Sequence, residues 1–182
     1  MQIEYTAEQA AIQPRLASAN INADTFLATD YLNHYNEIVM LLEMIPDMPE
    51  LAEDAADWAP KSYPQHFLDS GFQAKELAVQ AYALAPAPIR TQFEKICAEL
   101  DKLIQGTLAG MAAVNVAERG FTPAAQQLIR TRVDAIQGLL MKLNQVIHGK
   151  MEGDIELPEA VDEASLHDES AQTQADIDKL FD

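Results

Sequence analysis

Two stretches decide the fold: residues 89–114, IRTQFEKICAELDKLIQGTLAGMAAV, and residues 122–149, TPAAQQLIRTRVDAIQGLLMKLNQVIHG. In both, apolar or small residues recur at alternating spacings of four and three, which is the period of one helix face. The stripe of the first stretch is Ile89, Phe93, Ile96, Leu100, Leu103, Thr107, Gly110 and Val114. The stripe of the second is Ile129, Val133, Ile136, Leu140, Leu143 and Ile147.

A short connection separates these two helices. Gly120 suits the position after a helix end, and Thr122 followed by Pro123 suits a helix start, as cap and first residue. A tight connection between two long helices predicts an antiparallel hairpin packed at a shallow crossing angle. The sequence therefore predicts an all-α helical bundle built around a long antiparallel helical hairpin.

The N-terminal part of the chain adds further helices to this hairpin. Residues 1–22 are predicted to form an arm with one short helix, which begins at Thr6 with capping-box spacing and is interrupted by Pro14. Residues 23–45 carry an apolar stripe wide enough for burial on two sides, so a third long helix is predicted there. Pro46 ends that helix.

Repeated prolines shape the middle of the chain. Residues 47–88 contain several prolines and many acids, which predict short helices and a turn-rich connector around Trp58. The role of this acidic segment is left open by the sequence. Together these elements predict one helical bundle domain over residues 23–150.

The end of the chain has a different composition. Residues 151–182 carry a net charge of −10 out of −17 for the whole chain. Residues 151–172 offer little apolar surface to bury, so they are predicted to form a flexible acidic linker, a disordered tail on the bundle. Because an acidic field repels phosphate and anionic lipid, we expect a protein partner and neither nucleic acid nor membrane.

The single cysteine limits which disulfide bonds and metal sites the chain can form. Cys97 lies within an apolar helical pattern and is predicted to be a small buried hydrophobe. One cysteine excludes an intramolecular disulfide and a cysteine metal cluster. We expect no cofactor and no metal, and the absence of a basic, then apolar, leader predicts a cytoplasmic protein.

Residues 173–182 form a separate motif after the linker. Thr173 and Asp176 have the spacing of a helix start, and Ile177, Leu180 and Phe181 then fall on one helix face. Such a helix is too short to be stable alone, but it could fold in the groove of a partner. The sequence predicts an amphipathic docking peptide, with an unstructured end or a helix folded back on the bundle as alternatives.

The motif Gln174-Ala175-Asp176-Ile177-Asp178-Lys179-Leu180-Phe181 resembles the short peptides by which bacterial chemotaxis and flagellar proteins dock on receiver domains. It is similar to the C-terminal segment of CheZ-type chemotaxis phosphatases and to the N-terminal segment of the flagellar motor-switch protein. Both segments bind the CheY-type response regulator. The resemblance implies that the partner-binding residues are Gln174, Asp176, Ile177, Asp178, Leu180 and Phe181, with the three apolar ones as buried anchors.

The bundle also shows a weaker resemblance to the same phosphatases. Their catalytic helix reads Asp-x-x-Gly-Gln-Val-Ile, in which the glutamine positions the attacking water. This chain reads Met141-Lys142-Leu143-Asn144-Gln145-Val146-Ile147, so Asn144 replaces the glycine and the acid is missing. The resemblance makes Gln145 and Asn144 the catalytic candidates, and an enzyme would be an aspartyl-phosphate phosphatase.

The histidines raise two further possibilities. Asp30, His34 and Glu37 share a helix face, as ligands in a bundle metal site would, although a core histidine bonded to a carboxylate or tyrosine is the simpler interpretation. His34, His66 and His148 are the candidates for a phosphotransfer histidine. They lack the neighbouring lysine and glycine typical of such sites, and His148 sits where it complements a helix dipole.

The leading hypothesis is a helical regulator of bacterial two-component signalling, in chemotaxis or flagellar motility, that binds a CheY-like receiver domain through its C-terminal peptide. A CheZ-like response-regulator phosphatase is the first alternative. A structural bundle or phosphotransfer-like protein with an inert tail is the second. Heptad-like hairpins often dimerise, so a homodimer is also expected.

Overall fold

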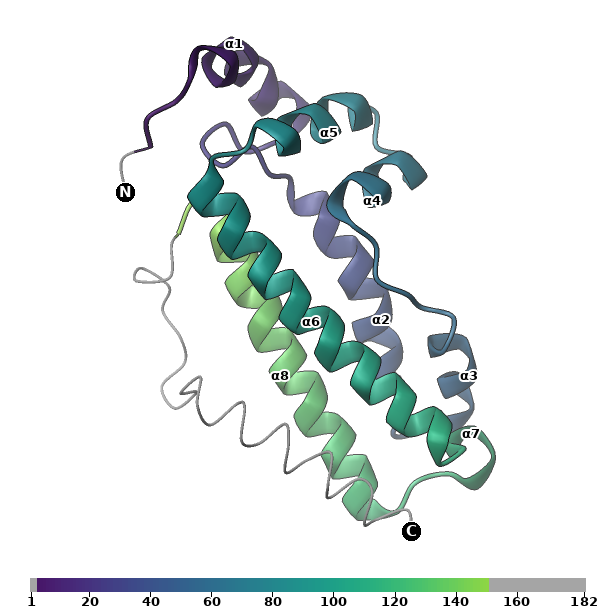
Figure 1. Cartoon of the computed structure of the whole chain (residues 1–182). Coiled ribbons are helices and arrows are strands. Elements are labelled where there is room, and N and C mark those ends of the chain that lie inside the picture. The colour runs from purple at the N-terminus through teal and green to yellow at the C-terminus, as the bar shows by residue number, and fades with distance from the viewer. Residues whose placement is uncertain (1–2, 151–182) are drawn as a thin grey trace. The chain divides into compact units, whose positions relative to one another are not determined.

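The computed structural model describes residues 3–150, and within them every regular element is helical, which confirms the predicted all-α fold (Figure 1). The predicted linker 151–172 and docking peptide 173–182 lie outside the described residues. The α-helices are α1 (Ala7–Leu16), α2 (Leu32–Met44), α3 (Ala52–Ala55), α4 (Tyr63–Asp69), α5 (Lys75–Leu84), α6 (Ala87–Ala113), α7 (Val116–Arg119) and α8 (Pro123–Ile147). Short 3-10 helices are η1 (Ala17–Ala19), η2 (Thr29–Tyr31) and η3 (Pro49–Leu51).

The described chain forms two compact units, and α2, α6 and α8 each contribute one part to both. Unit 1 comprises residues 3–36, 60–99 and 139–150, and unit 2 comprises residues 37–59 and 100–138. In unit 1, α5 packs against α4 and α1 (Figure 1). In unit 2, α7 packs against η3 and α3.

The first helix begins as its sequence predicts. The Thr6 hydroxyl accepts the Gln9 N–H at 3.2 Å, and the Gln9 amide oxygen accepts the Thr6 N–H at 2.8 Å, which completes a capping box. The predicted interruption at Pro14 is wrong, because α1 continues through it to Leu16. A proline this close to a helix end removes one intrahelical hydrogen bond without preventing the last turn.

The helix predicted over residues 23–45 is wrong at its start, because α2 begins only at Leu32. The Asn22 side-chain oxygen accepts the N–H groups of Asp24 and Thr25, which offers the backbone an alternative to helix. Phe26 has a φ of +67°, in the left-handed region, which also excludes an α-helix. The Thr25 hydroxyl donates to the Ile147 carbonyl at 2.6 Å and fastens this segment to the end of α8.

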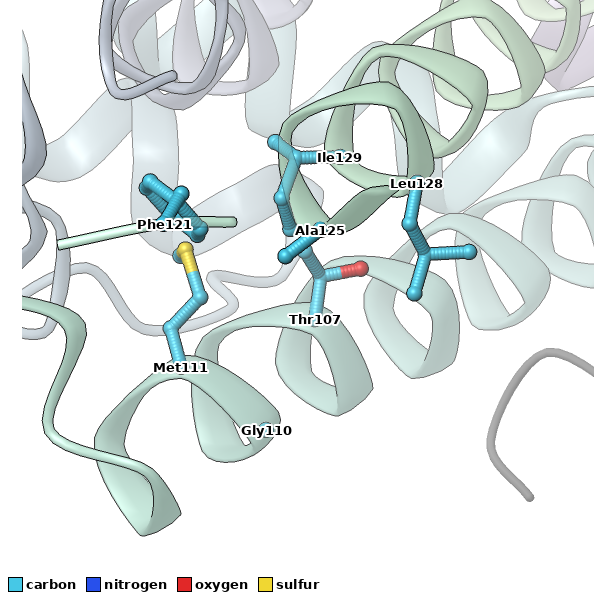
Figure 2. A pocket seen from close by; sticks show the side chains of 7 residues that line it. All are labelled: Thr107, Gly110, Met111, Phe121, Ala125, Leu128 and Ile129. Atoms are coloured by element: carbon cyan, nitrogen blue, oxygen red, sulfur yellow. The ribbon is translucent and has the colours of Figure 1, made fainter. Parts of the chain in front are cut away.

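In unit 2 the second half of α6 packs against the first half of α8 around a small apolar hollow. Figure 2 shows Met111 with its sulfur directed toward the Phe121 ring. The lining residues are Thr107, Gly110, Met111, Phe121, Ala125, Leu128 and Ile129. Late residues of α6 thus meet early residues of α8, so the two segments are antiparallel within this unit. The accessible volume of about 10 Å³ admits roughly one water molecule, so the hollow is packing space rather than a ligand site.

Most buried residues of α8 follow a seven-residue repeat. Its members are Ala125, Ile129, Arg132, Ile136, Leu139, Leu143 and Val146, each no more than 8% exposed. The predicted stripe is buried at Ile129, Val133, Ile136, Leu143 and Ile147 and is wrong only at Leu140, which is half-buried. A seven-residue repeat corresponds to 3.5 residues per turn, whereas a straight α-helix has 3.6 residues per turn. The repeat therefore shifts slowly around the helix, and which of two adjacent residues is more deeply buried changes along its length.

Arg132 is a charged residue within this apolar stripe. It is 6% exposed, and its Nε and Nη2 atoms are buried without a hydrogen-bond partner among the described residues. Burial lowers the pKa of its guanidinium from the usual value, because removal from water penalises the charged form. A buried and incompletely paired cation costs free energy, so this position reduces the stability of unit 2.

We expect Arg132→Met to stabilise the protein by about 1 kcal/mol or more, because methionine keeps the buried apolar stem and removes the desolvated charge. Differential scanning calorimetry would then show a Tm raised by roughly 2–4 °C for each kcal/mol. Arg130→Met is the matched control: Arg130 is exposed and pairs with Asp47 at 3.2 Å, so its loss should change stability little. A lower Tm for Arg132→Met would contradict this account.

Candidate functional site

Unit 1 contains a cluster of aromatic and histidine side chains, the aromatic–histidine cluster, with Tyr31 at its centre. Ring centroids lie 5.2 Å from Tyr31 to Tyr63, 5.6 Å to Phe93, 5.9 Å to His34 and 5.4 Å to His66. These residues come from η2, α2, α4 and α6, so the cluster joins elements that are distant in sequence. Edge and tilted ring contacts of this kind add stabilisation beyond buried area.

Hydrogen bonds fasten the connector of residues 60–62 and the first residue of α4 to the cluster. The Tyr31 hydroxyl donates to the Lys61 carbonyl at 2.6 Å, and the Lys61 N–H donates to His34 Nε2 at 3.1 Å. The Ala28 N–H donates to the Tyr63 hydroxyl oxygen at 2.8 Å. These bonds satisfy backbone groups at partly buried positions of Lys61 and at the buried Ala28, so the cluster has a structural role.

His34 is neutral in the folded protein. Burial is the largest cause that lowers its pKa from 6.5 to about 4, and the charges of His66 and Lys61 lower it further. Its Nε2 lone pair accepts the Lys61 N–H, so that nitrogen is already occupied. The interpretation of His34 as a hydrogen-bonded core histidine agrees with this geometry.

Asp30, His34 and Glu37, whose spacing suggested a possible metal site, are not brought together as ligands. Asp30 contacts His66 of α4 at 3.0 Å, and Glu37 is exposed. Within residues 3–150, no group of three His, Cys, Asp or Glu side chains is arranged to hold a metal ion.

The three phosphotransfer candidates lie in different surroundings. His34 is buried, and the His66 side chain is 12% exposed and contacts Asp30. His148 is exposed just after α8, where its ring Nδ1 lies 2.8 Å from the Asn144 carbonyl. A donor at this position complements the negative end of the helix, which is the role predicted for it.

Gln145 and Asn144, the catalytic candidates, lie in the last turns of α8 and are half-buried. The Asn144 carbonyl accepts the His148 backbone N–H at 3.1 Å. The Gln145 side-chain oxygen is buried and makes no hydrogen bond within the described part of the chain. An amide that positions a water on another protein must present its polar end at the surface, and this oxygen does not.

The partner-binding candidates Gln174, Asp176, Ile177, Asp178, Leu180 and Phe181 all lie outside the described residues. No protein-family profile, curated protein or solved structure matches this chain. None of the helices in residues 3–150 combines the length and the hydropathy that a bilayer span requires.

The sequence analysis missed one surface feature, a row of methionines. Met40, Met44 and Met48 are all exposed and are spaced four residues apart, so they follow one side of α2 and the turn after it. The spacing alone could have revealed the row, but it was hidden by the neighbouring apolar residues of the buried stripe, such as Val39 and Leu42.

His34 should make stability depend on pH. Below pH 6.5 the unfolded chain gains a proton at this histidine, whereas the folded chain gains it only near pH 4. The unfolded state therefore binds more protons in this window, and stability falls as the pH drops from 6.5 toward 4. Urea denaturation at several pH values should show a shallower loss for His34→Gln, with exposed His148→Gln as the control. Equal slopes for His34→Gln and the unmodified chain would contradict the assignment.

Proposed function

We propose that this chain is a cytoplasmic helical regulator of bacterial two-component signalling, in chemotaxis or flagellar motility, that binds a CheY-like receiver domain. The observation that carries the proposal is the motif Gln174-Ala175-Asp176-Ile177-Asp178-Lys179-Leu180-Phe181. Three apolar residues at helical spacing, flanked by acids, suit a groove with a basic rim. The bundle then serves as the body to which this peptide is joined.

The acidic segment 151–172 supports this arrangement through its composition. A peptide joined to the bundle by 22 residues stays close to any partner that is near the bundle. This raises the effective concentration of the peptide at that partner. Binding by the peptide alone is therefore enough to bring the bundle to a receiver.

The phosphatase alternative gains less support. Catalysis by positioning would require an exposed polar amide that reaches the receiver's phosphorylated aspartate. The Gln145 amide oxygen is buried, and Asn144 stands where the resembling phosphatases have glycine. We therefore propose that the chain is a binding protein rather than an enzyme.

Receiver binding should depend on the three anchors of the peptide. Replacing Ile177, Leu180 and Phe181 together by alanine removes the apolar contacts, so calorimetry with a beryllofluoride-activated CheY-type receiver should show affinity reduced by about tenfold or more. Alanine at Ile155, Leu157 and Val161 is the matched control, because these apolar residues belong to the same tail but lie outside the motif. Equal affinities for both variants, or no binding by the full chain, would refute the proposal.

Gln145 separates the binding protein from the phosphatase. We expect Gln145→Ala to leave the dephosphorylation rate of a phosphorylated CheY-type receiver unchanged, because the amide oxygen is not presented to a partner. Release of inorganic phosphate from the receiver, with and without the full chain, gives the rate. A rate enhancement by the full chain that Gln145→Ala removes would establish the phosphatase instead.

A further inference from the structure

The outer side of α2 carries an apolar row within an acidic surface. Met40 is 62% exposed, Met44 38% and Met48 40%. The Met48 N–H donates to the Met44 carbonyl at 2.9 Å, so the helical path continues past the end of α2 and keeps the row aligned. We call these three residues, with exposed Glu37, Glu43 and Asp47, the methionine face.

The methionine face is part of a strongly acidic segment. Residues 37–59, all in unit 2, contain seven Asp and Glu, every one exposed, and no Lys or Arg. Arg130 pairs with Asp47 at 3.2 Å, and the uncharged Gln137 amide donates to Glu43. Of the three acids on the methionine face, Glu37 and Glu43 therefore have no cationic partner among the described residues.

We propose that the methionine face binds a basic amphipathic helix of a partner protein. The row spans about 12 Å, or a little over two helical turns, which matches the apolar stripe of a short helix. Methionine is flexible and polarisable, so it adapts to different apolar side chains. The flanking carboxylates attract lysine or arginine beside that stripe.

Charge argues against the other occupants. The tail 151–182 has a net charge of −10, so its docking on this face would bring acids against acids. Two copies joined through this face would place Glu37 and Glu43 near the same acids of the second copy, since a symmetric contact is self-complementary. Like-charge contacts of this kind are unfavourable. The proposal does not depend on the receiver-binding function, because it uses a different surface and the opposite charge.

The test uses the full chain with [¹³C-methyl]methionine and a Lys/Leu amphipathic peptide of about 14 residues. We expect the methyl signals of Met40, Met44 and Met48 to shift on addition of the peptide, while those of buried Met111 and of Met141 stay in place. The triple change Met40→Gln, Met44→Gln and Met48→Gln, all at exposed positions, should weaken binding by about tenfold or more. Met141→Gln, which is also exposed but lies on α8, is the matched control.

Two control peptides separate recognition from bulk electrostatics. A scrambled peptide of the same composition has no apolar stripe, and a Glu/Leu version of the peptide has the opposite charge. Both should bind at least about tenfold more weakly than the Lys/Leu peptide, and added salt should weaken the Lys/Leu complex. Equal binding of the scrambled peptide, or full binding by the triple variant, would overturn the proposal.

Two further outcomes would assign the face to another occupant and also overturn the proposal. Shifts of the same three methyl signals on dilution of the full chain alone would show a contact between copies. A difference in these signals between the full chain and the variant with alanine at Ile177, Leu180 and Phe181 would show that the tail covers the face.

Discussion

The structure of unit 1 depends on how the backbone N–H and C=O of Lys61 are held. Its carbonyl accepts the Tyr31 hydroxyl and its N–H is accepted by His34, so two side chains satisfy both polar groups of one connector residue. The connector can therefore approach the aromatic core without leaving polar groups unpaired. This position in turn places Tyr63, which starts α4, among the rings of Tyr31 and Phe93.

The hydrogen bonds to Lys61 also limit the chemical roles that are open to the histidines of the cluster. His34 holds the connector only as a neutral acceptor, and its lowered pKa follows from the burial that this task requires. His66 completes the cluster, and its Nε2 contacts the Asp30 carboxylate. Of the residues that resemble a metal or phosphotransfer site in the sequence, His34 and His66 are thus part of the packing of unit 1.

The sequence predicted the helical class well because the stripes of α6 and α8 are long and regular. It failed where side chains compete with the backbone: the side chains of Asn22 and Thr25 accept hydrogen bonds from nearby backbone N–H groups, and α2 begins only at Leu32. Periodicity also could not reveal the unpaired burial of Arg132, because that depends on which neighbours surround the stripe. At the candidate site, the pattern suggested an available amide at Gln145, and only the fold shows that its oxygen is buried.

The most direct test of the account is amide NMR of the full chain titrated with a beryllofluoride-activated CheY-type receiver. The account predicts that signals of residues 173–182 change and that those of Asn144 and Gln145 do not, because the peptide binds and the end of α8 takes no part. Changes at Asn144 and Gln145, or no change at residues 173–182, would contradict it.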